Sequence, residues 1–250
     1  MVVYEDINLT ILKHLEGTSE LQVLDVGCGS GTFGQLLRKN GNYVEGITIS
    51  EKEAGIARKK LDNVYVLDVE EDLPSLNGEY DLIIFADILE HLRNPWEVLK
   101  KFKPYLKGSG RLIISVPNIA TWSIRFGLLL GRFEYRETGL MDVSHLRFFT
   151  VKTIKELVEK AGYSISAIDV TPNFCYAFID VIKFLFNKDK RGGIDHYSVN
   201  KSVLNSTSFK CYCRMVRPIE MFFARLWKGM FARQFVIIAE KDQEVLSGYR

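Results

Sequence analysis

Short apolar runs and amphipathic stretches alternate along the first half of the chain. The apolar runs have the length of buried strands, and the stretches between them carry apolar residues at helical spacing. Strands are predicted at residues 21–26, 43–49, 64–67, 80–85 and 111–116, and helices at 6–15, 32–40, 51–61 and 95–102. This alternation predicts an α/β fold of the Rossmann-like, doubly wound kind, with a mostly parallel sheet.

The second half of the chain is less regular. Residues 119–135 are apolar and basic, and they predict an inserted helix that covers the carboxyl edge of the strands. Further on, helices are predicted at 150–161, 174–186 and 218–228, and strands at 163–170 and 235–239. The 250 residues fit one domain with insertions better than two domains.

Composition excludes several classes of protein. A net charge of +2 gives no electrostatic reason to expect a nucleic-acid partner. No apolar stretch approaches the roughly 18 residues of a membrane span, and the first residues are acidic where a signal peptide is basic, so we expect a cytoplasmic protein. Cys211 and Cys213 lack a second pair of cysteines, and no metal site is expected.

A glycine-rich turn separates the first strand from the next helix. Gly27, Gly29 and Gly31 let the backbone approach a ligand there, and the helix dipole favours a polar or anionic group. Together with Gly34 they also fit the dinucleotide fingerprint, which is a weak signal by itself. A tight turn without a ligand is the alternative.

The wider context of this turn is more specific. The sequence VLDVGCGSG at 23–31 resembles the first motif of class I S-adenosylmethionine-dependent methyltransferases. Similar resemblances follow later strands, with DVEEDLP at 68–74 and DILEHL at 87–92. Within that superfamily, VPN at 116–118 and DVSHLRFFT at 142–150 look like a bacterial subgroup associated with cell-surface saccharide pathways. The resemblance covers residues 21–170 and implies S-adenosylmethionine as the cofactor.

The same resemblance implies a role for each matching residue. The backbone of the glycine turn would line the methionine end of the cofactor, Asp25 would hold its ammonium group, and Asp68 would accept from the adenine amino group. Asp87 would lie beside the methionine moiety or the acceptor entrance. The cofactor-binding residues expected are Asp25, Gly27, Cys28, Gly29, Gly31, Thr48, Asp68, Val69 and Asp87. A helix cap at Asp25 and a solvated turn at Asp68 are the alternatives.

Thr48 departs from the family pattern. The family usually has an acidic residue at this position, where a carboxylate accepts hydrogen bonds from both ribose hydroxyls. Glu45 or Glu51 is a possible replacement, and Ser50 could add a second hydroxyl. Strand alternation turns Glu45 to the side opposite Thr48, which favours Glu51. A pocket with a weaker ribose contact is the other interpretation.

His145 is the candidate catalytic residue. A hydroxyl acceptor must lose a proton, and histidine is suited to take it near neutral pH. The alternative is that His145 and Arg147 brace the insertion against the sheet, and His91 is expected to pack or cap behind its loop. Aromatic and basic residues of the insertion are expected to form a lid over the acceptor: Trp122, Arg125, Phe126, Arg132, Phe133 and Tyr135. A helix packed on the core with a basic face toward solvent is the alternative.

The function predicted is therefore S-adenosylmethionine-dependent methyl transfer to oxygen or nitrogen of a small molecule or glycan precursor. In this scheme residues 1–118 form the cofactor half, 119–150 the lid, and 151–250 the rest of the sheet and the acceptor side. An NAD-binding oxidoreductase and a non-catalytic cofactor-binding scaffold remain as alternatives. The apolar and basic region 175–228 suggests contact with an apolar or lipid-linked acceptor or with a membrane surface, and burial against the sheet or in a dimer interface is the alternative.

Overall fold

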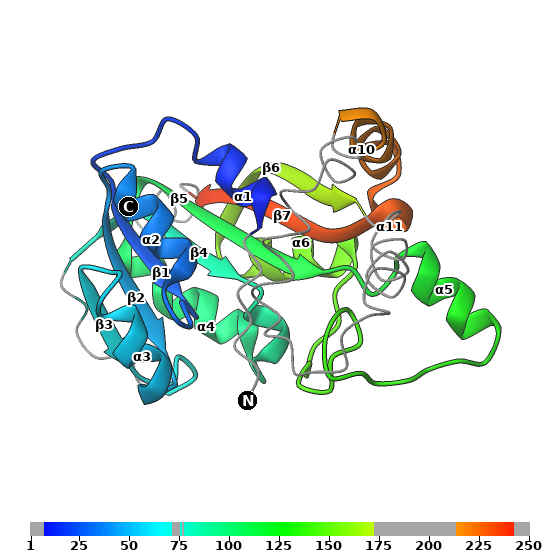
Figure 1. Cartoon of the computed structure of the whole chain (residues 1–250), viewed down its shortest axis with the longest axis horizontal. Helices are drawn as coiled ribbons and strands as arrows, with labels where there is room; N and C mark the ends of the chain where they lie inside the picture. The colour runs from blue at the N-terminus through cyan, green and yellow to red at the C-terminus, as the bar shows by residue number, and fades with distance from the viewer. Residues whose placement is uncertain (1–7, 72–75, 77, 173–213, 243–250) are drawn as a thin grey trace, which may run out of the picture.

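A seven-stranded sheet forms the centre of the molecule in a computed structural model that describes residues 8–71, 76, 78–172 and 214–242 (Figure 1). The strand order is β3-β2-β1-β4-β5-β7-β6. The strands are β1 (Gln22–Val26), β2 (Tyr43–Thr48), β3 (Asn63–Val66), β4 (Tyr80–Ala86), β5 (Leu106–Pro117), β6 (Tyr163–Pro172) and β7 (Ala232–Lys241). Strands β1 to β5 pair in parallel, whereas β7 runs antiparallel to both of its neighbours. The prediction of a Rossmann-like, mostly parallel sheet is confirmed.

Helices cover both faces of the sheet. They are α1 (Leu9–His14), α2 (Thr32–Lys39), α3 (Glu51–Ala57), α4 (Pro95–Phe102), α5 (Trp122–Leu129), α6 (Val151–Lys160), α10 (Arg217–Leu226) and α11 (Lys228–Phe231), with short 3-10 helices η1 (Leu89–His91) and η2 (Lys103–Tyr105). Residues of α1, α2 and α3 join one buried apolar cluster and residues of α4, α6 and α10 join the other. Ile113 and Ile114 face opposite clusters, which explains why these strands are apolar throughout.

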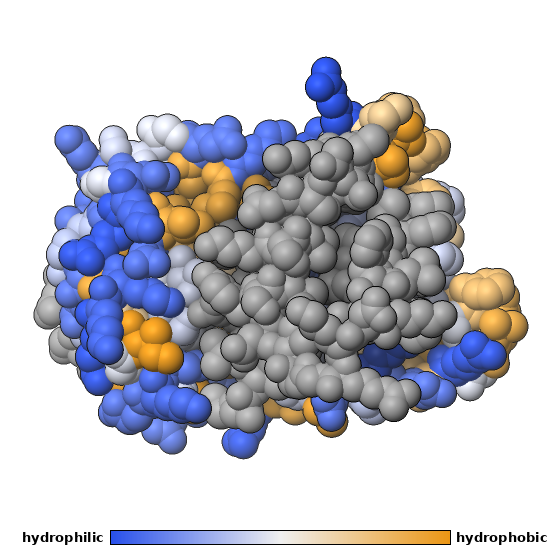
Figure 2. Space-filling view, viewed as in Figure 1, coloured by the Kyte–Doolittle hydropathy of each residue, from blue (hydrophilic) through white to orange (hydrophobic). Residues whose placement is uncertain are grey.

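The predicted insertion contains a shorter helix than its composition suggested. Helix α5 covers residues 122–129 within the apolar stretch 119–135, and none of its residues is buried. Apolar side chains gather over α5 and α10 in the surface view (Figure 2), where Leu129 is 81% and Leu226 is 72% exposed. Helix α5 is therefore not packed on the core.

Two predictions about the last third of the chain have different outcomes. The helix expected at 174–186 lies outside the described residues, as does most of the region 175–228. The last strand forms, as β7, but lies between β5 and β6. None of the helices in the described ranges is long and apolar enough to cross a bilayer.

Candidate active site

A cavity opens at the carboxyl edge of the sheet, near the ends of the neighbouring strands β1 and β4. From β1 the chain continues to β2 on one side of this pair, and from β4 it continues to β5 on the other side. This reversal of strand order leaves a crevice outside the strand ends. The cavity has a volume of about 1410 Å³ and is lined by the segments that follow β1, β2, β3, β4 and β5. Single-ligand pockets occupy about 300–1,000 Å³, so this cavity has room for a cofactor and a second molecule.

The glycine turn is held in shape by the next strand. Gly27 and Cys28 both donate their amides to the carbonyl oxygen of Ile47, at 2.9 and 2.8 Å. Gly27, Gly29 and Gly31 all have positive φ angles, which L side chains rarely adopt. A Cβ on Gly27 would lie 2.7 Å from Ile88, whereas one on Gly29 would meet nothing within 4 Å. Gly29 thus combines a glycine backbone conformation with open space at the cavity wall.

Asp25 is the second-last residue of β1, in a buried position that also borders the cavity. Asp25 is only 2% exposed, and its Oδ2 atom has no hydrogen-bond partner. Burial raises the pKa of Asp25 to about 7. A cationic group in the cavity would supply the missing partner, which fits the predicted contact with the cofactor ammonium.

The carboxylate beside Thr48 belongs to Glu53. Thr48 Oγ1 donates to Glu53 Oε2 at 3.1 Å, and both residues line the cavity. Glu51, which the sequence favoured for this place, does not line the cavity and instead lies 3.5 Å from Arg58 with a side chain 75% exposed. Glu45 accepts from Tyr80 and Asn63 in a buried network outside the cavity.

A sequence signal for Glu53 exists. Ser50 caps α3 and accepts from the amide of Glu53 at 3.3 Å, and the spacing Ser-x-x-Glu is the pattern that places a glutamate in the first turn of a helix. The Glu53 side chain reaches back to Thr48 and not to the amide of Ser50, which donates to Thr48 Oγ1.

The remaining predicted cofactor residues also border the cavity. Asp68 accepts from the amide of Glu70 at 2.9 Å, and Val69 is buried beside it. Asp87 has a φ of 51° and accepts hydrogen bonds from Ser115 at 3.0 Å and from Gln234. Burial raises the pKa of Asp87, against the opposing effect of these two donors. Side chains of β5 and β7 therefore hold the Asp87 carboxylate in place.

His145 lies in a turn that is attached to the segment after β4. The amides of Leu146 and Arg147 both donate to the carbonyl oxygen of Glu90, at 2.8 and 2.9 Å. Arg147 also donates from its guanidinium to the carbonyl of Arg93. Arg147 therefore braces this turn, which was the alternative role considered for both His145 and Arg147. His145 itself borders the cavity, as do Glu90 and His91.

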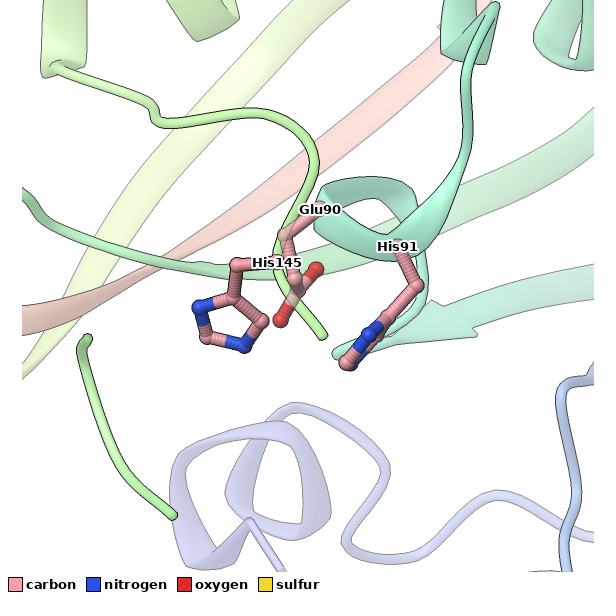
Figure 3. Close-up of side chains that lie close together, drawn as sticks. All are labelled: Glu90, His91 and His145. Carbon is pink, nitrogen blue, oxygen red and sulfur yellow. The ribbon is translucent and has the colours of Figure 1, made fainter. Parts of the chain in front are cut away.

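Three titratable side chains meet at this place (Figure 3). The rings of His91 and His145 are 4.9 Å apart between centroids, and Figure 3 shows the carboxyl group of Glu90 between them. Burial and the neighbouring His91 lower the pKa of His145, whereas Asp142 and the carbonyl of Leu140 raise it. Burial raises the pKa of Glu90 well above its ordinary value, and Asp87 adds to this. Sequence reasoning did not connect Glu90 or His91 with His145.

Part of the expected lid borders the cavity. The lining includes Trp122, Phe126, Arg132 and Phe133 but not Arg125 or Tyr135. Arg125 instead donates from its guanidinium to the carbonyl of Ala120 at 2.5 Å. Arg136, which was not singled out, also lines the cavity.

Comparisons with known proteins agree with this geometry. Residues 6–168 match the family described as "Methyltransferase domain". Ubiquinone biosynthesis O-methyltransferase of Acinetobacter baylyi is 27% identical over 157 residues, which are 60% of this chain and 66% of that protein. The protein of the same name from Dechloromonas aromatica is 32% identical over 115 residues, which are 43% of this chain and 49% of that protein. The chain thus spans between about half and two thirds of these relatives.

Solved structures share the fold. A SAM-dependent methyltransferase from Archaeoglobus fulgidus has a TM-score of 0.58 at 22% identity, covering 93% of this chain and 90% of that one. Magnesium protoporphyrin IX methyltransferase from Synechocystis, with bound SAH (S-adenosylhomocysteine), has a TM-score of 0.52 at 21% identity, covering 66% and 75%. The prediction of S-adenosylmethionine as the cofactor is confirmed. The chain belongs to the methyltransferase-domain family, within the class I S-adenosylmethionine-dependent methyltransferases.

Proposed function

We propose that this chain transfers the methyl group of S-adenosylmethionine to a hydroxyl oxygen of a small-molecule acceptor. The observation that carries the proposal is that one cavity joins the glycine turn and Asp25 to the cluster that contains His145. When bound, the cofactor supplies an electrophilic methyl group on a positively charged sulfur. The chain's own contribution is to align the acceptor with that methyl group, since proximity alone can supply several kcal/mol.

The acceptor side supports oxygen as the atom that is methylated. A hydroxyl must lose its proton during the transfer, and His145, which borders the cavity, is the residue that we propose assists this. The relatives named above carry the name O-methyltransferase. In the transfer the oxygen electron pair forms the new C–O bond, the C–S bond breaks, and its electron pair stays on the sulfur of S-adenosylhomocysteine.

A glycan precursor is the second candidate acceptor, and residues 119–150 favour it. The lining of the cavity includes the aromatic residues Trp122, Phe126 and Phe133 and the guanidinium groups of Arg132 and Arg136. Aromatic faces with guanidinium groups suit a ring that carries a phosphate. In this proposal the segment acts as the lid over the acceptor.

The function is tested on the purified full chain with methyl-labelled S-adenosylmethionine. Calorimetric titrations with S-adenosylhomocysteine and with NAD are expected to show binding of the first and none of the second. Phenolic, sugar-phosphate and amine acceptors are then compared, and label is expected in a hydroxyl acceptor. Label that enters only amines would contradict oxygen transfer, and cofactor binding without any transfer would favour a binding scaffold.

The affinity for S-adenosylhomocysteine is expected to rise with pH through neutrality. Burial raises the pKa of Asp25 to about 7 in the free protein, and a bound ammonium group favours the ionised form, so binding releases a proton. Binding should therefore be weak below that pKa and should level off above it, with about tenfold tighter binding at pH 8 than at pH 6. Calorimetry at several pH values measures this.

Asp25→Asn is the control for this pH dependence. The variant is expected to bind more weakly at pH 8 and to retain only the dependence that comes from the ligand's own ionisation. An unchanged pH profile in Asp25→Asn would show that another group is titrating.

Glu53→Gln is expected to weaken S-adenosylhomocysteine binding by about tenfold. We propose that Glu53 supplies the ribose carboxylate that the family usually carries at Thr48, and charge-assisted hydrogen bonds are roughly twice as strong as neutral ones. Glu51→Gln is the matched control, because it removes the same charge from the same helical turn outside the cavity. Equal effects of the two substitutions would indicate a general electrostatic effect and would remove Glu53 from the ribose site.

A further inference from the structure

The cluster beside the acceptor end of the cavity has the composition of a metal site. Glu90 and His91 come from η1 and His145 from the turn after residue 141, and one ligand atom of each lies within 4.8 Å of the other two. Figure 3 shows the Glu90 carboxyl group between the two imidazole rings. A tetrahedral zinc ion with bonds of about 2.0–2.2 Å holds neighbouring ligand atoms roughly 3.3–3.6 Å apart. The three atoms are thus within about 1.5 Å of the required spacing.

Glu90 provides an independent observation that points to a cation. The residue is 1% exposed, and its Oε2 atom has no hydrogen-bond partner. Within the described ranges, no lysine or arginine forms a salt bridge with Glu90. The carboxylates of Asp87 and Asp142 act on it electrostatically as well. Burying a carboxylate without a cationic partner is costly, and a divalent ion would compensate this charge.

The Nδ1 atom of each histidine ring lies near a backbone carbonyl oxygen. His91 Nδ1 lies 3.3 Å from the carbonyl oxygen of Ser144, and His145 Nδ1 lies 3.3 Å from that of Leu140. A carbonyl oxygen only accepts, so the hydrogen of each neutral ring belongs on Nδ1 and the lone pair on Nε2. A backbone carbonyl on one ring nitrogen is a common support for a histidine that binds metal through the other.

We propose that Glu90, His91 and His145 bind one divalent transition-metal ion. One carboxylate and two imidazoles match Zn²⁺, and imidazole ligands argue against Mg²⁺. Three protein ligands leave a position open toward the cavity that all three residues line, and an acceptor hydroxyl fits this position.

The role in catalysis rests on the proposed function, whereas the metal site does not. A hydroxyl bound to the ion loses its proton to solvent at a lower pH. The oxygen then forms the C–O bond as the C–S bond breaks, and the electron pair of that bond goes to sulfur. The predicted role of His145 at the acceptor is then carried out through the ion.

Metal binding is tested on the full chain by dialysis against Zn²⁺ and by the visible absorption of bound Co²⁺. The parent is expected to bind one equivalent of Zn²⁺, with no competition from millimolar Mg²⁺. Glu90→Gln, His91→Gln and His145→Gln are each expected to weaken binding by at least about tenfold. His14→Gln is the matched control, because His14 also lies beside a carboxylate, 3.2 Å from Asp169, but does not line the cavity.

The outcomes separate a specific site from general binding. The absence of saturable binding in the parent overturns the site, and so does an equal loss in His14→Gln. Glu90→Gln keeps the backbone carbonyl that holds the turn of His145. Should a variant nevertheless fail to fold, the Co²⁺ spectrum of the parent decides, since four-coordinate Co²⁺ gives intense visible bands that six-coordinate aqueous Co²⁺ lacks.

Two further measurements keep the site and its function apart. A parent that binds Zn²⁺ but not S-adenosylhomocysteine would refute the proposed function and leave the metal site standing, and the reverse result would do the opposite. Catechol, used as a hydroxyl probe, is expected to shift the Co²⁺ bands while the ion stays bound. Unchanged bands at saturating catechol would overturn the open position.

Discussion

Gly29→Val is expected to weaken the binding of S-adenosylhomocysteine by at least about 100-fold, or roughly 2.7 kcal/mol. Gly29 lies in the turn that should touch the methionine end of the cofactor, and a side chain there would extend into space that holds no other atom within 4 Å. The φ of 50° adds backbone strain of about 1–2 kcal/mol for a branched residue. Calorimetry on the folded variant measures the loss.

Gly17→Val separates the strain from the blocked ligand. Gly17 has a φ of 76°, and a Cβ added there would meet no atom within 4 Å, as at Gly29, but Gly17 lies outside the cavity lining. Its substitution should therefore lower the thermal stability by a similar amount and leave the affinity unchanged. Equal affinity of Gly29→Val and the parent would place the cofactor elsewhere.

His145→Ala is expected to lower the turnover number by about 100-fold or more while the affinity for S-adenosylhomocysteine changes less than about twofold. Cofactor affinity should be nearly unchanged because His145 lies in the cluster with Glu90 and His91 and not at the glycine turn. Initial rates of methyl transfer and calorimetry on the same preparation give both quantities. A parallel loss of cofactor affinity or of thermal stability would instead indicate a bracing role.

Combining substitutions shows whether His145 acts alone. When two residues act as one unit, removing the first already abolishes the effect of the second. The double variant of His145→Ala with Glu90→Gln should therefore be little slower than either single variant. Multiplied losses would mean that His145 acts independently of Glu90, as a simple proton acceptor does.

Local periodicity and strand-end motifs were enough to predict the crevice at which we propose that the cofactor binds. Apolar runs separated by amphipathic helices specify a doubly wound sheet, and the carboxyl ends of parallel strands share one edge. Asp25, Thr48, Asp68 and Asp87 each lie at or just after the end of a predicted strand, so their meeting in one cavity could be inferred from the sequence.

The direction of the last strand and the identity of the second carboxylate were not determined in this way. A short apolar run such as that of β7 reads the same in either direction, and only pairing with β5 and β6 makes it antiparallel and places it between them. Glu51 and Glu53 lie in the same helical turn, and the direction from which α3 approaches β2 decides that Glu53 contacts Thr48.

The sequence by itself did not predict that Glu90, His91 and His145 form one cluster. His91 and His145 are separated by 53 intervening residues, and no periodic pattern relates them. They meet because two amides of the turn at 146–147 donate to the carbonyl of Glu90, which is a backbone contact that any residue type could make. The chain's sequence thus determined the sheet and the crevice at its carboxyl edge through local spacing, whereas tertiary packing decided which buried carboxylate lies between the two histidines.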